Sequence, residues 1–292
     1  MRVTEVRMVE LVTKALERAR DRAAETGNVV STGVRADVPS VDPTAWQDGM
    51  RAKVRTALSE HHGSTIGRTK DALAGQEGAL ETLMQAFIRA HEIALGAANG
   101  SMNAQDRGTS AREAQALHGT ALVAGNTRGP NGEYLFSGSL GQSQAYDSTG
   151  AYNGDAQTEQ VEVGEMGQLA PGLLNGTALR DVNGVNVMGL IGQLATDLST
   201  NNLASISASL SRFNDAIDAL ARARTQVGAR MSAFDSADEA RRSLQLHLQE
   251  TYSKTISADP VAAASDLAQA KNALEASQAV AQQIVTITRP QA

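Results

Sequence analysis

The sequence predicts a mainly α-helical protein, an elongated rod of long antiparallel coiled-coil-like helices from both ends of the chain, with one small β-rich insertion. Apolar residues recur at helical spacings of three and four on both sides of the insertion. Aromatic residues make up only 3% of the 292 residues, whereas compact enzymes need more aromatic bulk for a core and a pocket. Residues 129–185 are instead dense in glycine, asparagine, serine and threonine, which favours short strands and turns.

The first predicted helix covers about the first 30 residues and has one apolar stripe. The stripe consists of Val9, Val12, Leu16, Ala19 and Ala23. Gly27 and Asn28 are expected to weaken the helix after it. So few sizeable apolar side chains cannot offset the entropy of ordering this segment. The end helix is therefore predicted to become ordered only when neighbouring subunits pack against it.

The second helical region begins after a proline-rich loop. Pro39 and Pro43 disfavour helix at the residues before them, and Asp42 is a plausible N-cap with Pro43 as first helical residue. We expect a helix to about residue 61 and a very regular one from about residue 64 to 98. The regular part repeats every seven residues at Ile66, Leu73, Leu80, Phe87 and Ala94, with Leu83, Ala90 and Ala97 in the alternate positions. A further helix is expected over residues 104–126.

The insertion is predicted to contain strands at residues 134–137 and 160–163. Residues 147–155 faintly resemble a calcium-binding loop but lack its alternating ligands and closing glutamate. We therefore expect a hairpin turn there.

The strongest pattern follows a short helix expected at residues 187–198. It consists of Ile206, Leu210, Phe213, Ile217, Leu220, Arg224, Val227, Met231 and Phe234. Only Arg224 is polar, and it either pairs with a carboxylate to fix the helix register or extends to solvent. Gly228 costs about 1 kcal/mol in a helix interior, so we expect another backbone or side chain close to it. Asp259 and Pro260 start the last helix, whose stripe includes Ala263, Leu267, Ala270, Leu274, Ala281 and Ile284.

Several functional classes are not supported by the sequence. There is no cysteine, the five histidines are scattered, and no nucleotide-binding or hydrolase motif occurs. No catalytic, cofactor-binding or metal residue is therefore predicted, and the protein is not expected to be an enzyme. The net charge of −6 without a basic stripe argues against nucleic acid. No apolar run suits a membrane span or a Sec-type signal peptide.

Five local motifs resemble those of the hook-associated protein 3 (hook–filament junction protein) family, which belongs to the flagellin family. They are Ser31-Thr32-Gly33-Val34-Arg35, Pro39-Ser40-Val41-Asp42-Pro43, Gly132-Glu133-Tyr134-Leu135-Phe136-Ser137-Gly138, Tyr152-Asn153-Gly154-Asp155 and Val227-Gly228-Ala229-Arg230. Two features depart from the family pattern. Val41 stands where the family has an aspartate, and residues 288–292 do not form the usual leucine-rich tail.

The resemblance implies a passive structural adaptor on the bacterial flagellum, outside the cell, with no cofactor or small-molecule substrate. It also implies export through the flagellar type III apparatus with the help of a cytosolic chaperone. Such a subunit forms a ring with copies of itself, between hook-associated protein 1 and flagellin.

A flagellin-like division of the chain is expected from the same resemblance. Residues 1–33 and 258–292 would form inner-tube helices, residues 34–131 and 186–257 a helical rod, and residues 132–185 an outer β-rich domain. The expected assembly contacts are Val9, Val12, Leu16, Ala19, Leu267, Ala270, Leu274, Ala281 and Ile284. The expected structural motif residues are Pro39, Ser40, Asp42, Pro43, Tyr134, Phe136, Gly138, Arg224, Gly228 and Arg230.

Two alternatives remain at this point. A flagellin or minor filament subunit would share the fold and the terminal helices. A cytosolic coiled-coil scaffold would instead stay in the cell, and its helical ends would pair in isolation.

Overall fold

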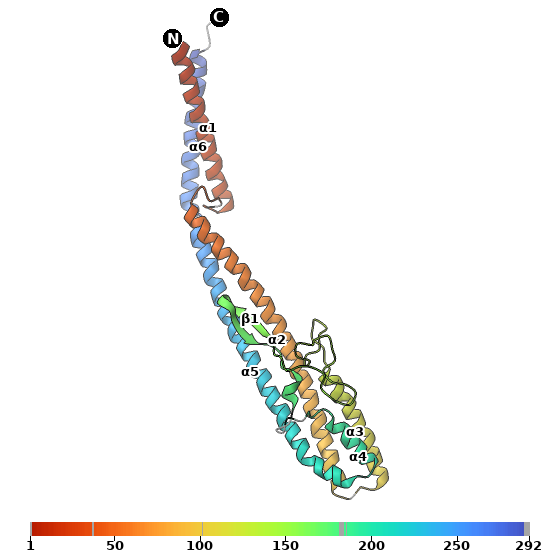
Figure 1. Cartoon of the computed structure of the whole chain (residues 1–292). Helices are drawn as coiled ribbons and strands as arrows, with labels where there is room; N and C mark the ends of the chain where they lie inside the picture. Colours follow the sequence, from red (N-terminus) through yellow and green to blue (C-terminus); the bar gives the residue numbers. More distant parts are fainter. Residues whose placement is uncertain (1, 37, 101, 181–183, 185, 289–292) are drawn as a thin grey trace. The chain divides into compact units, whose positions relative to one another are not determined.

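The computed structural model describes residues 2–36, 38–100, 102–180, 184 and 186–288. Helices dominate this part of the chain (Figure 1). They are α1 (Arg2–Thr32), α2 (Pro43–Ala98), α3 (Ala104–Gly125), α4 (Leu190–Ser199), α5 (Leu203–Ile256) and α6 (Pro260–Thr288). The strands of the described residues are β1 (Gln160–Gly164) and β2 (Gln168–Pro171), so the predicted mainly α class with a small β element is confirmed.

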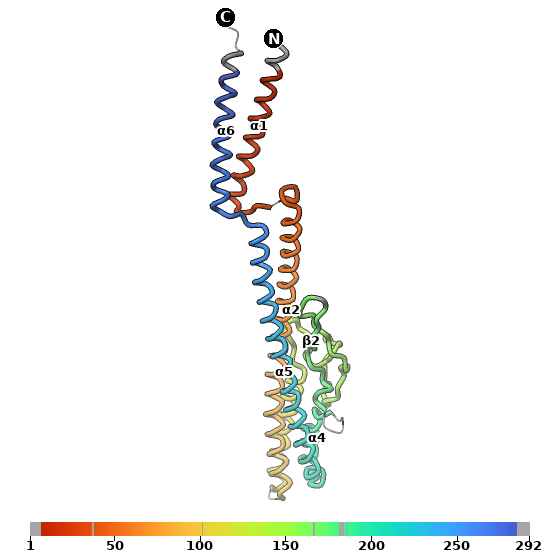
Figure 2. The backbone as a smooth tube through the Cα atoms, turned by 90° about the vertical axis from the view of Figure 1, so that its left-hand side faces the viewer, coloured from red at the N-terminus to blue at the C-terminus, as the bar shows by residue number. Residues whose placement is uncertain are grey.

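The chain divides into two units, one of residues 1–57 and 244–292 and the other of residues 58–243. In the first unit, α1 and α6 lie side by side (Figures 1 and 2). Asp42 caps α2, because its carboxylate accepts a hydrogen bond of 3.0 Å from the Ala45 amide. Asp259 does the same for α6, with a bond of 2.8 Å from the Val261 amide. Both predicted helix starts are correct.

The second unit holds the main core, which is formed by α2, α3, α4, the insertion and the first part of α5. All five residues of the seven-residue repeat on α2 are buried. On α5 the repeat splits into two rows. Ile206, Phe213, Leu220, Val227 and Phe234 are completely buried, whereas Leu210, Ile217, Arg224 and Met231 are only partly buried. The rings of Phe87 and Phe213 meet edge to face across the two helices, 6.2 Å apart.

Three local predictions need correction. Helix α1 continues past Gly27 and Asn28 to Thr32, and α2 runs through Gly63 without a break. A Cβ at residue 63 would lie only 2.9 Å from the guanidinium group of Arg241. Gly63 therefore leaves room for the Arg241 side chain beside α2. The short fourth helix begins at Leu190 rather than at residue 187.

Residues 134–137 form a turn instead of the predicted strand. The Ser137 amide bonds back to the Tyr134 carbonyl at 3.5 Å, and Gly138 follows with a positive φ of 71°. The predicted strand at residues 160–163 is correct: β1 pairs antiparallel with β2, with Val161 opposite Ala170. The expected hairpin turn at residues 147–155 is also present, closed by a bridge between Tyr146 and Tyr152.

Candidate assembly site

The terminal helices bring the two predicted apolar stripes together. On α6, Ala270 is buried, and Leu267, Leu274, Ala281 and Ile284 are half-buried. On α1, Val12, Leu16 and Ala19 are half-buried, while Val9 is 43% exposed. The contact between the helices is close, since a Cβ at Gly27 would lie 3.9 Å from Leu267 Cδ1. The stripes therefore meet within a single chain, and most of their residues are only partly shielded there.

A second apolar group on the terminal helices points away from this contact. It consists of Met8, which is 57% exposed, and Leu11, which is 69% exposed, both in the first turns of α1. The sequence pattern did not single out these residues, because the stripe of Val9, Val12 and Leu16 is the stronger one on this helix. Met8, Leu11 and Ala15 have the same spacing of three and four and could have been recognised by it.

The ends of α1 and α5 are joined by a short antiparallel backbone contact, which we call the clasp (residues 33–35 and 256–258). The Arg35 amide donates to the Ile256 carbonyl at 2.7 Å, and the Ala258 amide donates to the Gly33 carbonyl at 2.8 Å. Arg35 also forms an ion pair of 3.2 Å with Asp42, the cap of α2. The amide of Ala45 is the main reason that the pKa of Asp42 is lowered, and Arg35 lowers it further.

The clasp has its own small apolar core. Ala36, Ala45, Ala52 and Ile256 are all buried. Gly49 on α2 makes room for Ile256, because a Cβ at Gly49 would lie 1.9 Å from Ile256 Cδ1. Of the motif residues predicted here, Asp42 and Pro43 start α2, whereas Pro39 and Ser40 are exposed. Two of the family-like motifs thus meet at the clasp, where they fix the connection from α1 to α2.

In the second unit, Gln76 of α2 holds the insertion on the helix. Its side chain is fully buried, and its Nε2 donates to the carbonyls of Leu135 at 2.6 Å and Leu174 at 2.7 Å. Its Oε1 accepts a bond of 3.1 Å from the Leu174 amide. All the main hydrogen-bonding groups of this glutamine are therefore used to bind two insertion segments.

Two further motifs bind each other inside the insertion. The Tyr152 hydroxyl lies 3.0 Å from the Phe136 carbonyl and 2.7 Å from the Asp155 carbonyl. The Asp155 carboxylate accepts a hydrogen bond of 2.9 Å from the Ser139 amide and another from the Ser139 hydroxyl, which is the main cause of its lowered pKa. A Cβ at Gly138 would lie 2.0 Å from Asp155 Oδ1, and its positive φ also favours glycine.

Tyr134 and Arg230 fasten the edges of the same insertion. The guanidinium group of Arg128 lies over the Tyr134 ring, 4.4 Å from its centre, and donates to the Tyr134 hydroxyl at 2.8 Å. Arg230 extends from α5 and donates to the Gly172 carbonyl at 2.6 Å. Burial lowers the pKa of Arg230. Arg230 is thus a structural anchor for the segment after β2.

The two alternatives for Arg224 are resolved by its contacts with α2. Its Nε and Nη2 donate to Glu77 Oε1 at 2.9 and 2.7 Å, and its Nη1 pairs with Glu81. The side chain is 35% exposed, so this pair lies at the edge of the helix contact and is not in the core. Arg224 therefore pairs with carboxylates across α2 and α5 in a defined helix register.

The prediction for Gly228 is wrong for the single chain. Gly228 lies on an exposed side of α5, and no heavy atom of the described residues lies within 4 Å of a Cβ placed there. The sequence could identify an unusual glycine within a helix, but it could not identify the side of the helix on which that glycine lies.

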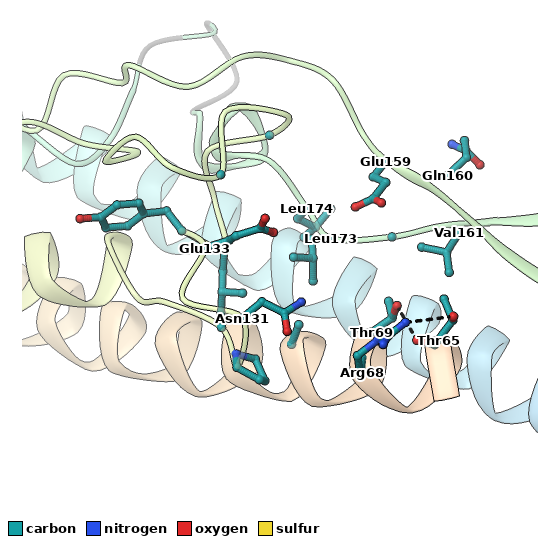
Figure 3. A pocket seen from close by; sticks show the side chains of 18 of the residues that line it. Thr65, Arg68, Thr69, Asn131, Glu133, Glu159, Gln160, Val161, Leu173 and Leu174 are labelled. Carbon is teal, nitrogen blue, oxygen red and sulfur yellow. Dashed lines mark hydrogen bonds between the residues drawn. The ribbon is translucent and has the colours of Figure 1, made fainter. Parts of the chain in front are cut away.

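A polar cleft of about 440 Å³ separates α2 from the insertion (Figure 3). Thr65, Arg68 and Thr69 of α2 face Glu159 and Val161 across it, and Arg68 donates to the Thr65 hydroxyl at 3.3 Å. No group of side chains suited to a metal ion occurs among the residues that the structure describes. None of the described helices is long and apolar enough to cross a membrane.

Comparisons with known proteins give a consistent result. Residues 8–140 match the family of the bacterial flagellin N-terminal helical region. The chain is 22% identical over 261 residues to flagellar hook-associated protein 3 of Salmonella typhimurium, and the match covers 82% of each of the two chains.

Solved structures of similar proteins share the fold. A putative flagellar hook-associated protein from Vibrio parahaemolyticus has a TM-score of 0.68 at 23% identity, covering 74% of this chain and 100% of that one. Hook-associated protein-3 from Legionella pneumophila has a TM-score of 0.62 at 17% identity, covering 70% of this chain and 98% of that one. These relatives favour the hook-associated interpretation over flagellin and over a cytosolic scaffold. The chain is thus similar in sequence to flagellar hook-associated protein 3, and its residues 8–140 match the flagellin N-terminal family, in line with the resemblance of its motifs.

Proposed function

We propose that the chain is a structural subunit of the hook–filament junction of a bacterial flagellum. It would be exported through the type III apparatus, guided by a cytosolic chaperone, and assembled outside the cell as a ring between hook-associated protein 1 and flagellin. It would have no catalytic role. The relatives named above support this proposal.

The observation that carries the proposal is the apolar surface left on the terminal helices. The α1–α6 contact leaves Met8 and Leu11 more than half exposed on a helix with few large apolar side chains. Exposed apolar residues grouped on one element are typical of a surface that another subunit covers. We expect neighbouring copies of the chain to cover them, and we expect the terminal helices of a dilute monomer to lose order.

The junction role predicts a specific phenotype when the protein is missing. Two helical polymers with different mechanical properties can join only through a subunit that matches both. A deletion strain should therefore keep its hooks, lack filaments and release flagellin into the medium. Normal filaments in the deletion strain would disprove the junction role.

A pair of variants on α1 tests whether the exposed apolar group makes the subunit contacts. Leu11→Glu places a charge on the apolar surface, whereas Thr13→Glu places the same charge on the exposed polar side two residues later. Both should leave the second unit folded. Only Leu11→Glu should reproduce the deletion phenotype when it replaces the natural protein. Ala270→Glu is less informative, because Ala270 is already buried in the single chain and its substitution would also break the α1–α6 contact.

A further inference from the structure

Four Asn-Gly pairs with described structures differ sharply in their surroundings. They begin at residues 99, 131, 153 and 175; the fifth, at residue 183, lies outside the described residues. In such a pair the backbone nitrogen of the glycine can attack the asparagine Cγ and release ammonia. Water then opens the resulting five-membered imide to aspartate or isoaspartate. The absence of a Cβ on glycine makes the attack easier, so the surrounding structure determines the rate.

Asn175 is held in a way that prevents this reaction. It is 7% exposed, and its Nδ2 donates to the carbonyl of Ala156 at 3.0 Å. Its Oδ1 accepts a bond of 3.1 Å from the Thr177 amide. The attacking nitrogen, that of Gly176, donates to the Phe136 carbonyl at 2.7 Å. Both reacting groups are therefore engaged in hydrogen bonds.

Asn131 and Asn153 are exposed, but their backbones are restrained. The Gly132 amide donates to the Gly129 carbonyl at 2.9 Å, which engages the attacking nitrogen. The residues on both sides of Gly154 form backbone hydrogen bonds. The Asn153 amide donates to the Ala145 carbonyl at 2.8 Å, and the Asp155 amide donates to the Ser137 carbonyl at 3.2 Å. The rotation needed to close the imide ring would break these bonds.

Among the described residues, Asn99 has fewer such restraints. It follows the last residue of α2, its side chain is exposed, and its amide makes a single bond of 3.3 Å to the Leu95 carbonyl. Within the described part of the chain, neither the Asn99 side chain nor the Gly100 amide has a hydrogen-bond partner. Gly100 has open space around it and a positive φ of 68°. We infer that Asn99 is a site of spontaneous deamidation, with water as the only co-reactant.

The product would change the end of α2. A new carboxylate would lie beside the last carbonyls of α2, at the negative end of the helix dipole, which is unfavourable. Isoaspartate would also lengthen the backbone. The modification would therefore weaken the connection between α2 and α3 as the protein ages.

The test is to incubate the full-length protein in mildly alkaline buffer and to follow each Asn-Gly peptide by mass spectrometry. Asn99 should convert at least about tenfold faster than Asn175, because Asn175 reacts only after local unfolding. In denaturant this ratio should fall towards one. Asn99→Gln should abolish the signal at residue 99 and leave the other sites unchanged. Equal rates at residues 99 and 175 in the folded protein, or earlier conversion at residue 131 or 153, would overturn the inference.

Discussion

Replacing Gln76 by methionine should destabilise the second unit more than any comparable change on the surface of α2. The side chain is 0% exposed and makes three hydrogen bonds to the backbone of the insertion. Methionine has a similar shape but cannot replace these bonds. The carbonyls of Leu135 and Leu174 and the amide of Leu174 would then be buried without partners.

The expected size of the effect follows from these three groups. A buried backbone group without a partner costs about 1–3 kcal/mol, so the total is roughly 3 kcal/mol or more. Domains are typically stable by about 5–15 kcal/mol, so the loss is a large fraction of the total. Part of it should be local, because the insertion can separate from α2 while the helices stay folded.

Urea denaturation measures the global loss, and hydrogen exchange at the Leu174 amide measures the local one. Gln85→Met is the matched control, since Gln85 is exposed on the same helix and bonds only to Glu81 among the described residues. It should change the free energy of unfolding by no more than about 0.5 kcal/mol. If Gln76→Met has the same urea midpoint and the same Leu174 protection as the natural chain, the anchoring role of Gln76 is refuted.

Three further substitutions test other contacts. Gly49→Ala should lower the free energy of unfolding by about 1–3 kcal/mol through overpacking against Ile256, offset by about 1 kcal/mol because alanine favours the helix. In an Ile256→Ala background the same change should be stabilising, and equal effects of Gly49→Ala in both backgrounds would contradict the close contact. Gly228→Ala should stabilise the monomer by about 1 kcal/mol, and Gly228→Leu should still fold, so filament loss with Gly228→Leu would indicate a contact between subunits. Arg224→Met should lower the melting temperature at low salt, and the difference from the natural chain should shrink at high salt if Glu77 pairing is the cause.

The long helices could be predicted from sequence because their apolar repeat reports directly which side is buried. The same repeat contained an unused signal. Leu83, Ala90 and Ala97 form one row of α2, and counting back by seven residues gives Gln76. A polar residue in an apolar row, like Arg224 on α5, marks a position where a side chain binds something specific. Its partners could not be predicted, because they lie 59 and 98 residues further along the chain.

The insertion was harder to predict because short turns, and not long strands, hold most of its backbone, and several of its hydrogen bonds reach distant segments. Residues 134–137 have strand-like composition, yet the Leu135 amide donates to Thr127, and the Leu135 carbonyl accepts from Gln76. The preference of these residues for strands reflects how their side chains pack on a sheet, so it does not predict the conformation of a segment that has no neighbouring strand. Gly138, with its positive φ and its contact with Asp155, was the local sign of a turn.

The positions of the family-like motifs also limit what those motifs can say about assembly. The segments around Arg35 and Asp42 make the clasp, those around Phe136 and Asp155 bind each other, and Arg230 holds the insertion. These contacts lie within one chain, so the fold explains these motif residues, although it does not explain Gly228. We propose that the residues that distinguish one partner from another lie on exposed surfaces, such as the one around Leu11 and the side of α5 that carries Gly228. Exchanging exposed α1 residues with those of a relative should therefore alter partner choice, whereas exchanging clasp residues should alter stability alone.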